Sequence, residues 1–182
     1  CLSCSVLFGG LLSLVASWFA SVRAEEMPPS SVGAVMKLFQ SGRLPAERQG
    51  PVVEMICNRG NEHDLKVIFD RLVDPNGFAP ALRVKAMSWL ADAATTRKVK
   101  PAGDLSQLEK LTESDDAAVQ LSALQLASLW KIASISKSLQ TIALNEKSSP
   151  ELQQAAIEGL ASLGDDGARE TLAGWVHRRR DL

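Results

Sequence analysis

The chain contains no tyrosine, and aromatic residues make up only 5% of its 182 residues. It also has no run in which Val, Ile or Thr alternates with polar residues. Strands favour β-branched and aromatic side chains, so a β-sandwich is not expected. Hydrophobic residues nevertheless account for 46% of the chain, enough for a core. These features predict an all-α fold, as one domain with an N-terminal appendage.

Residues that commonly carry chemistry are also scarce. His63 and His177 are the only histidines, and neither stands at a metal-ligand spacing from another ligand. The pair Cys1 and Cys4 is not followed by histidine and precedes an apolar segment, so we interpret it as part of a targeting sequence. Cys57 is interpreted as a small buried hydrophobe. With no Gly-rich phosphate loop and no Gly-x-Ser-x-Gly motif, we predict no catalytic residues, no metal site and no cofactor.

The balance of charge gives no reason to expect a nucleic-acid partner. The formal net charge is −1 at pH 7. Two basic runs, Arg97–Lys100 and Arg178–Arg180, could contact an anionic surface, but such runs are usually solvated. We therefore predict no nucleic-acid binding.

Residues 5–20 form an apolar, uncharged run that precedes Ser21-Val22-Arg23-Ala24 and then Glu25. Small residues before a polar start are typical of a cleavage site, so residues 1–24 are predicted to be a signal peptide and residues 25–31 a linker. This pattern predicts an exported protein, periplasmic or extracellular. The alternative is an uncleaved N-terminal anchor at residues 5–20, and only then would the protein contact a membrane.

The clearest helical pattern is the stretch from Ser149 to Gly164. Ser149 can cap the helix and Pro150 suits its first position, whereas Gly164 can take a positive φ at its end. Leu152, Ala156, Ile157 and Leu160 recur on one face. Asp165 and Asp166 begin a further helix that carries Ala168, Leu172 and Trp175.

Similar apolar stripes begin at Leu82 and Val119 and, more weakly, at Glu47, which gives a period of between thirty and forty residues. A shorter helix is predicted before each stripe: Val32–Gln40, Leu65–Val73, Leu105–Leu111 and Leu139–Leu144. Helix pairs at this period are typical of an α-solenoid. We predict a right-handed solenoid of four helix pairs and a terminal helix over residues 32–182.

Some local features are predicted within these pairs. Pro45 should begin one helix, with a kink or a late start at Gly50-Pro51. Asn61 and Ser134 are predicted caps. Trp130 should face the core, and Trp89 should lie on the flank that meets a neighbouring repeat. Leu124 and Ile157 should be buried, so their replacement by Ala should be costly, whereas Gln125→Ala should cost little.

The Leu-x-x-x-Ala-Ile-x-x-Leu run followed by Leu163-Gly164-Asp165-Asp166 resembles a HEAT repeat, particularly the short repeats of phycobilisome-lyase-type HEAT proteins. A signal followed by such repeats also resembles the HEAT region of exported PVC-type haem-binding dehydrogenase-like proteins, whose Cys-x-x-Cys-His motif this chain lacks. In a HEAT-like stack the second helices line the concave surface, which would place Ser88, Gln125 and Glu158 there.

We therefore predict a non-enzymatic scaffold that binds an unknown protein partner through Ser88, Gln125 and Glu158. Two alternatives remain open at this stage: the repeat region of a larger exported c-type haem or dehydrogenase-like enzyme, and a lyase-like HEAT protein that acts on a chromophore.

Overall fold

The computed structural model describes residues 30–180, and every regular element in that range is helical, as predicted. The predicted signal segment, residues 1–24, and nearly all of the linker lie outside the described residues. The side chains of Trp175 and His177 are also not described, so what the sequence predicts for these two residues is not tested. The nine α-helices of the described range are α1 (Gly33–Gln40), α2 (Ala46–Arg59), α3 (Glu62–Val73), α4 (Pro80–Asp92), α5 (Glu109–Thr112), α6 (Ala117–Trp130), α7 (Ser136–Leu144), α8 (Pro150–Leu163) and α9 (Asp166–Arg180).

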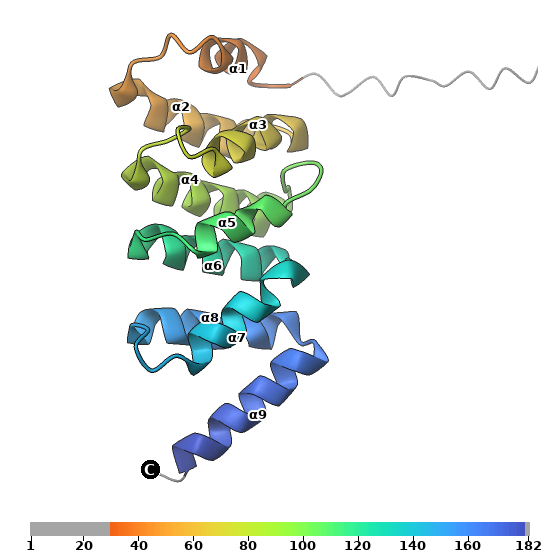
Figure 1. Ribbon diagram of the computed structural model, residues 1–182. Helices are drawn as coiled ribbons and strands as arrows, with labels where there is room; N and C mark the ends of the chain where they lie inside the picture. Colours follow the sequence, from red (N-terminus) through yellow and green to blue (C-terminus); the bar gives the residue numbers. More distant parts are fainter. Residues whose placement is uncertain (1–29, 181–182) are drawn as a thin grey trace, which may run out of the picture.

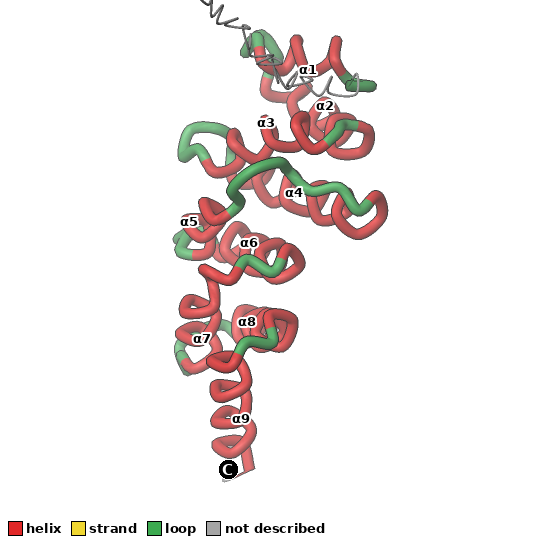
Figure 2. The backbone as a smooth tube through the Cα atoms, turned by 90° about the vertical axis from the view of Figure 1, so that its right-hand side faces the viewer, coloured by secondary structure: helices red, strands yellow, loops and turns green. Residues whose placement is uncertain are grey.

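The helices follow one another along a single long axis (Figure 1). Helix α2 packs on α4, α4 on α6 and α6 on α8, which makes one layer of even-numbered helices. The shorter helices α5 and α7 lie beside that layer in a second one (Figure 2). Each even-numbered helix also contacts the odd-numbered helix before it, and α9 packs against α7 and α8 at the end of the chain. Nearly all contacts are therefore made between neighbours in the sequence or in the stack.

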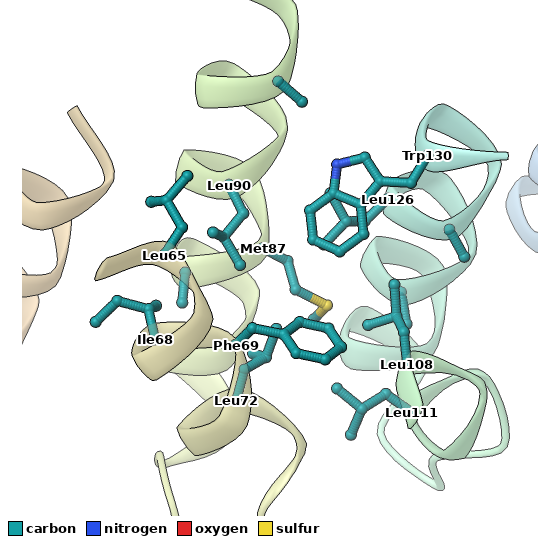
Figure 3. Packing of buried hydrophobic residues seen from close by; sticks show 14 of the residues in the cluster. Leu65, Ile68, Phe69, Leu72, Met87, Leu90, Leu108, Leu111, Leu126 and Trp130 are labelled. Carbon is teal, nitrogen blue, oxygen red and sulfur yellow. The ribbon is translucent and has the colours of Figure 1, made fainter. Parts of the chain in front are cut away.

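The core is a band of apolar side chains between the two layers. Phe69 on α3, Met87 on α4, and Leu108, which precedes α5, converge there with Trp130 of α6 (Figure 3). The rings of Phe69 and Trp130 lie 5.9 Å apart, a normal distance for an aromatic pair. Trp130 is only 6% exposed, so the prediction that it faces the core is confirmed.

An aromatic cluster helps to hold the first helix. The ring of Phe39 on α1 lies 6.2 Å from the ring of Phe78, just before α4. The guanidinium of Arg71 on α3 lies 5.1 Å from the Phe39 ring centroid, within the range of a cation–π contact. Few other side chains of α1 are buried.

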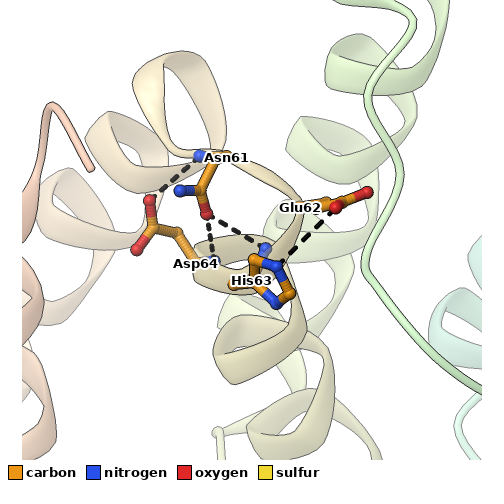
Figure 4. Close-up of polar contacts among 4 residues, drawn as sticks. All are labelled: Asn61, Glu62, His63 and Asp64. Atoms are coloured by element: carbon orange, nitrogen blue, oxygen red, sulfur yellow. Dashed lines mark hydrogen bonds and ion pairs between the residues drawn. The ribbon is translucent and has the colours of Figure 1, made fainter. Parts of the chain in front are cut away.

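Side-chain caps define several of the helix starts that the sequence predicts. Asn61 accepts hydrogen bonds from the backbone N–H groups of His63 and Asp64, and Asp64 accepts from the Asn61 N–H, which completes a capping box (Figure 4). Ser149 accepts from the Leu152 N–H, and the predicted positive φ of Gly164 is observed, at 64°.

The predicted cap at Ser134 is wrong. That residue lies inside a 3₁₀ turn, Ala133–Ile135, which leads directly into α7. Its side chain makes no capping hydrogen bond there. Ile135, the last residue of this turn, is fully buried.

Helix α2 starts where predicted, with Pro45 as its N-cap, but its register differs from the prediction. It begins at Ala46 and runs through Pro51 without a late start. Pro51 is exposed, so water can satisfy the carbonyl that proline leaves without a donor. The buried face is Val53, Ile56 and Cys57, and not the stripe predicted from Glu47.

The third short helix is also less regular than predicted. Instead of one helix over Leu105–Leu111, a 3₁₀ turn at Ser106–Leu108 precedes α5, which is a single α-helical turn. The Asp104 side chain accepts from both the N–H and the hydroxyl of Ser106, which favours a turn over a regular helix start.

The register of α8 is rotated relative to its prediction. Ala155, Ala156, Gly159 and Leu160 are buried, whereas Ile157 is only half-buried, so its predicted full burial is wrong. A Cβ on Gly159 would lie 2.4 Å from the Ser128 hydroxyl oxygen. The small residues let α8 approach α6 closely, and that approach decides which side chains are enclosed.

Candidate interaction surfaces

The three residues predicted to bind a partner are all exposed on the layer of even-numbered helices. Ser88 lies on α4, Gln125 on α6 and Glu158 on α8, and these helices pack in that order. Glu158 accepts a hydrogen bond from Gln154 of its own helix at 2.9 Å. We call these three residues the polar row. Their role in binding stays a prediction.

A groove of about 440 Å³ lies between α2 and α4. Its apolar part includes Leu82 and Trp89, both half-buried, and its charged part includes Glu54 and Lys85. Trp89 thus lies where two neighbouring even-numbered helices meet, as predicted, and part of its ring remains accessible. We call this site the α2/α4 groove.

A second pocket, of about 420 Å³, lies where α2 ends and α3 begins. Its lining includes the cationic residues Arg59, Arg97, Lys98 and Lys100 and one carboxylate, Glu62. We call it the basic pocket. The sequence identified the run Arg97–Lys100 as basic but gave no sign that Arg59 joins it.

Arg97 is held firmly at the wall of this pocket. Its Nη1 donates to the carbonyl oxygen of Cys57 at 2.6 Å, and its Nη2 donates to the carbonyl of Gly60. It therefore satisfies carbonyls at the C-terminal end of α2, where a cation also suits the helix dipole. Arg97 ends a π-helical extension of α4, Ala93–Arg97, which brings its side chain across to α2.

The segment that enters α1 is also tied to this region. The Ser30 hydroxyl donates to the carboxylate of Asp64 at 2.6 Å, and the Ser31 hydroxyl donates to the Arg59 carbonyl at 2.7 Å. Asp64 is a buried carboxylate, but it accepts from Ser30 and from the Asn61 N–H, so its burial is compensated.

Cys57 lies at the buried face of α2 and does not resemble a nucleophile. Burial raises the pKa of its thiol from 9.0 to about 12, while the charge of Arg97 lowers it and that of Glu54 raises it. The thiolate is the reactive form, so this thiol is inert near neutral pH. The interpretation of Cys57 as a small hydrophobe agrees with its complete burial.

His63 lies exposed in the first turn of α3, with its Nε2 3.7 Å from a carboxylate oxygen of Glu62 (Figure 4). Within residues 30–180, no cluster of three or more His, Cys, Asp or Glu side chains is arranged to hold a metal ion. Within the same range, no helix has the length and apolar character needed to cross a membrane. The predicted anchor at residues 5–20 lies outside that range.

Comparisons with protein-family models, curated proteins and solved structures gave no significant match to this chain. The resemblance to HEAT repeats therefore stays a prediction that is carried by the residues quoted above alone.

Proposed function

We propose that this chain is a HEAT-like α-solenoid that acts as a non-enzymatic scaffold and binds a protein partner on its even-numbered helices. The observation that carries the proposal is the continuous layer formed by α2, α4, α6 and α8, in which each helix packs on the next. Stacked helices of this kind present an extended surface whose shape depends only on contacts between neighbours. The polar row lies exposed on that layer.

The chemistry of the surface suits a protein ligand. The α2/α4 groove combines the accessible parts of Leu82 and Trp89 with charged side chains of both signs. Leu129, one turn beyond Gln125 on α6, is 39% exposed. Aromatic and aliphatic anchors beside polar groups are typical of protein interfaces.

Site-specific crosslinking tests this proposal. A photoreactive residue in place of Gln125 should give a discrete adduct with one protein in the source cells, and Ser88→Arg in the same chain should weaken that adduct. The matched control is the same photoreactive residue in place of Thr141, which is exposed on α7 in the other layer. Equal labelling at both positions, or no adduct at Gln125, would contradict a partner on the even-numbered helices.

We also propose that the protein is exported and loses residues 1–24, on the basis of the apolar run and the small residues that follow it. The intact mass of the native protein tests this directly. A chain that begins at Glu25 supports cleavage, whereas a chain that retains residues 5–20 supports the membrane-anchored alternative.

A further inference from the structure

We propose that the basic pocket binds an acidic peptide segment. This site is distinct from the polar row, because it lies where α2 meets α3 and is lined by none of the row's residues. The inference does not rest on the scaffold function proposed above. Its argument depends on the charge of the pocket, the fixed backbone beneath that charge and the size of the space.

The charge of the pocket is the first element. Four cationic side chains line it against a single carboxylate, although the whole chain carries a net charge of −1. Among residues 30–180, none of these four cations forms an ion pair, whereas Glu62 faces His63. Lys100 makes only a long contact, 3.5 Å from its Nζ to the carbonyl of Trp130, so most of its donor capacity remains free. An anionic ligand would thus meet cations that are not paired with any carboxylate of residues 30–180.

The backbone that carries Lys98 and Lys100 is the second element. On one side Val99 donates its N–H to the Ala93 carbonyl at 3.3 Å, and on the other Ala102 donates to the Glu62 carbonyl at 3.0 Å. Lys98 itself has a φ of 58°, in the left-handed region that favours glycine. Because both ends of this loop are anchored, binding needs to order side chains only, which lowers its entropic cost.

Stabilisation of helix ends explains only part of this cluster. Cations at the C-terminal end of a helix are favourable, which accounts for Arg59 on α2 and for Arg97. The position of Lys131, which follows the last residue of α6 with a φ of 56°, is explained by the same favourable interaction with a helix C-terminus. Lys100 lies beyond the last helical turn of its own segment, but it reaches the C-terminal end of α6 through its 3.5 Å contact with the Trp130 carbonyl. Stabilisation of helix ends does not require that four cations share one pocket with a single carboxylate.

The size of the pocket favours a peptide over a free anion. A space of about 420 Å³ is several times larger than one carboxylate or one phosphate. Half-buried Val99 adds an apolar wall, which could contact the aliphatic part of a glutamate side chain. Several acidic side chains in succession would fill this space and pair with more than one cation.

The test uses the full chain and a fluorescently labelled hexaglutamate peptide, with hexaglutamine as the uncharged probe. Binding followed by fluorescence anisotropy should be saturable, at least tenfold weaker for hexaglutamine, and weaker as salt is raised because exposed charges are screened. Lys98→Gly alone should weaken hexaglutamate binding, and Lys98→Gly combined with Arg59→Gln should weaken it about tenfold. Glycine suits the left-handed backbone at residue 98, so the fold should be kept, which circular dichroism will check.

Lys131→Gly is the matched control, because it removes the same charge from the same backbone conformation at a residue that does not line the pocket. It should change hexaglutamate affinity less than twofold. Equal losses for Lys98→Gly and Lys131→Gly would show a general charge effect and overturn the proposal. Competition by inorganic phosphate at the same concentration as hexaglutamate would show a simple anion site and would also overturn it.

Glu25 and Glu26 stand only a few residues before Ser30, which lines the pocket, so the chain's own acids are tested as rival ligands. The variant Glu25→Gln/Glu26→Gln should bind hexaglutamate as the unaltered chain does. If only this variant binds the peptide, the pocket serves an internal segment, and the proposal of an external acidic partner is wrong. Crosslinking at Gln125 tests the scaffold proposal on the even-numbered helices, whereas peptide binding tests the basic pocket. Either proposal can therefore fail without the other.

Discussion

Gly159 lies on α8 against Ser128 of α6 and Leu139 of α7. A Cβ at this position would lie 2.4 Å from the Ser128 hydroxyl oxygen and 3.0 Å from both Leu139 methyl carbons. We expect Gly159→Ala to destabilise the protein by roughly 1–3 kcal/mol, because overpacking outweighs the gain in helix propensity. Gly174→Ala on α9 is the control, since nothing lies within 4 Å of its Cβ position, and it should be neutral or stabilising. Urea unfolding of the two variants measures both effects, and equal stability would contradict the close approach.

Substitutions at Leu124 and Ile157 can distinguish the observed burial of α8 from the burial predicted from the sequence. Leu124 is completely buried, whereas Ile157 is only half-buried. Leu124→Ala should therefore cost about 2–5 kcal/mol, Ile157→Ala clearly less, and Gln125→Ala almost nothing. Denaturant midpoints for the three variants give the order directly. A loss for Ile157→Ala as large as that for Leu124→Ala would restore the full burial of Ile157 that the sequence predicts.

Cys57 should make stability depend on pH in the alkaline range. Its folded-state pKa is raised from 9.0 to about 12, so folding favours the neutral thiol. The corresponding stabilisation is complete below pH 9 and is lost as the pH rises toward 12, because the unfolded chain releases the proton first. The chain has no tyrosine to titrate in that interval. The stability difference between the unaltered chain and Cys57→Ala should shrink from pH 8.5 to pH 11, and a constant difference would show that burial does not perturb this thiol.

At the level of single elements, the caps differ in importance. Asn61 closes a reciprocal capping box, whereas the Ser134 side chain caps nothing. We expect Asn61→Ala to lower the free energy of unfolding by about 1 kcal/mol, a usual cost for losing a cap, and Ser134→Ala to leave it nearly unchanged. Thermal unfolding of both variants checks this. A comparable effect of the two substitutions would mean that the box contributes little beyond solvent hydrogen bonds.

At the level of the whole molecule, the stack should be least stable at its ends. Helix α6 buries seven of its side chains between neighbours on both sides, whereas α1 buries only Met36 and Phe39. Because contacts run mainly between neighbours, the terminal helices can open without the centre. Native-state hydrogen exchange should show the strongest protection in α6 and the weakest in α1 and α9. Uniform protection along the chain would indicate a single cooperative unit.

Much of this fold can be predicted from the residues alone. Local interactions determine where several helices start, namely a side-chain cap at Asn61 and Ser149 and the geometry of proline at Pro80. The end of α8 at Gly164 is likewise local, because glycine readily adopts a positive φ. The all-helical class follows from apolar periodicity and the lack of strand-forming runs. These features involve residues within a few positions of one another, so the sequence displays them directly.

Only the tertiary structure decided the register of α2 and α8 and the make-up of the basic pocket. In α8, buried Ala156 and half-buried Ile157 are neighbours in the sequence. Which of the two is enclosed depends on how closely α8 approaches α6 at Gly159. Arg59 and Lys98 meet because α2 and the end of α4 pack side by side, although they are far apart in the chain. Local patterns determine which segments are helical, whereas packing between distant segments determines which side chains share a surface.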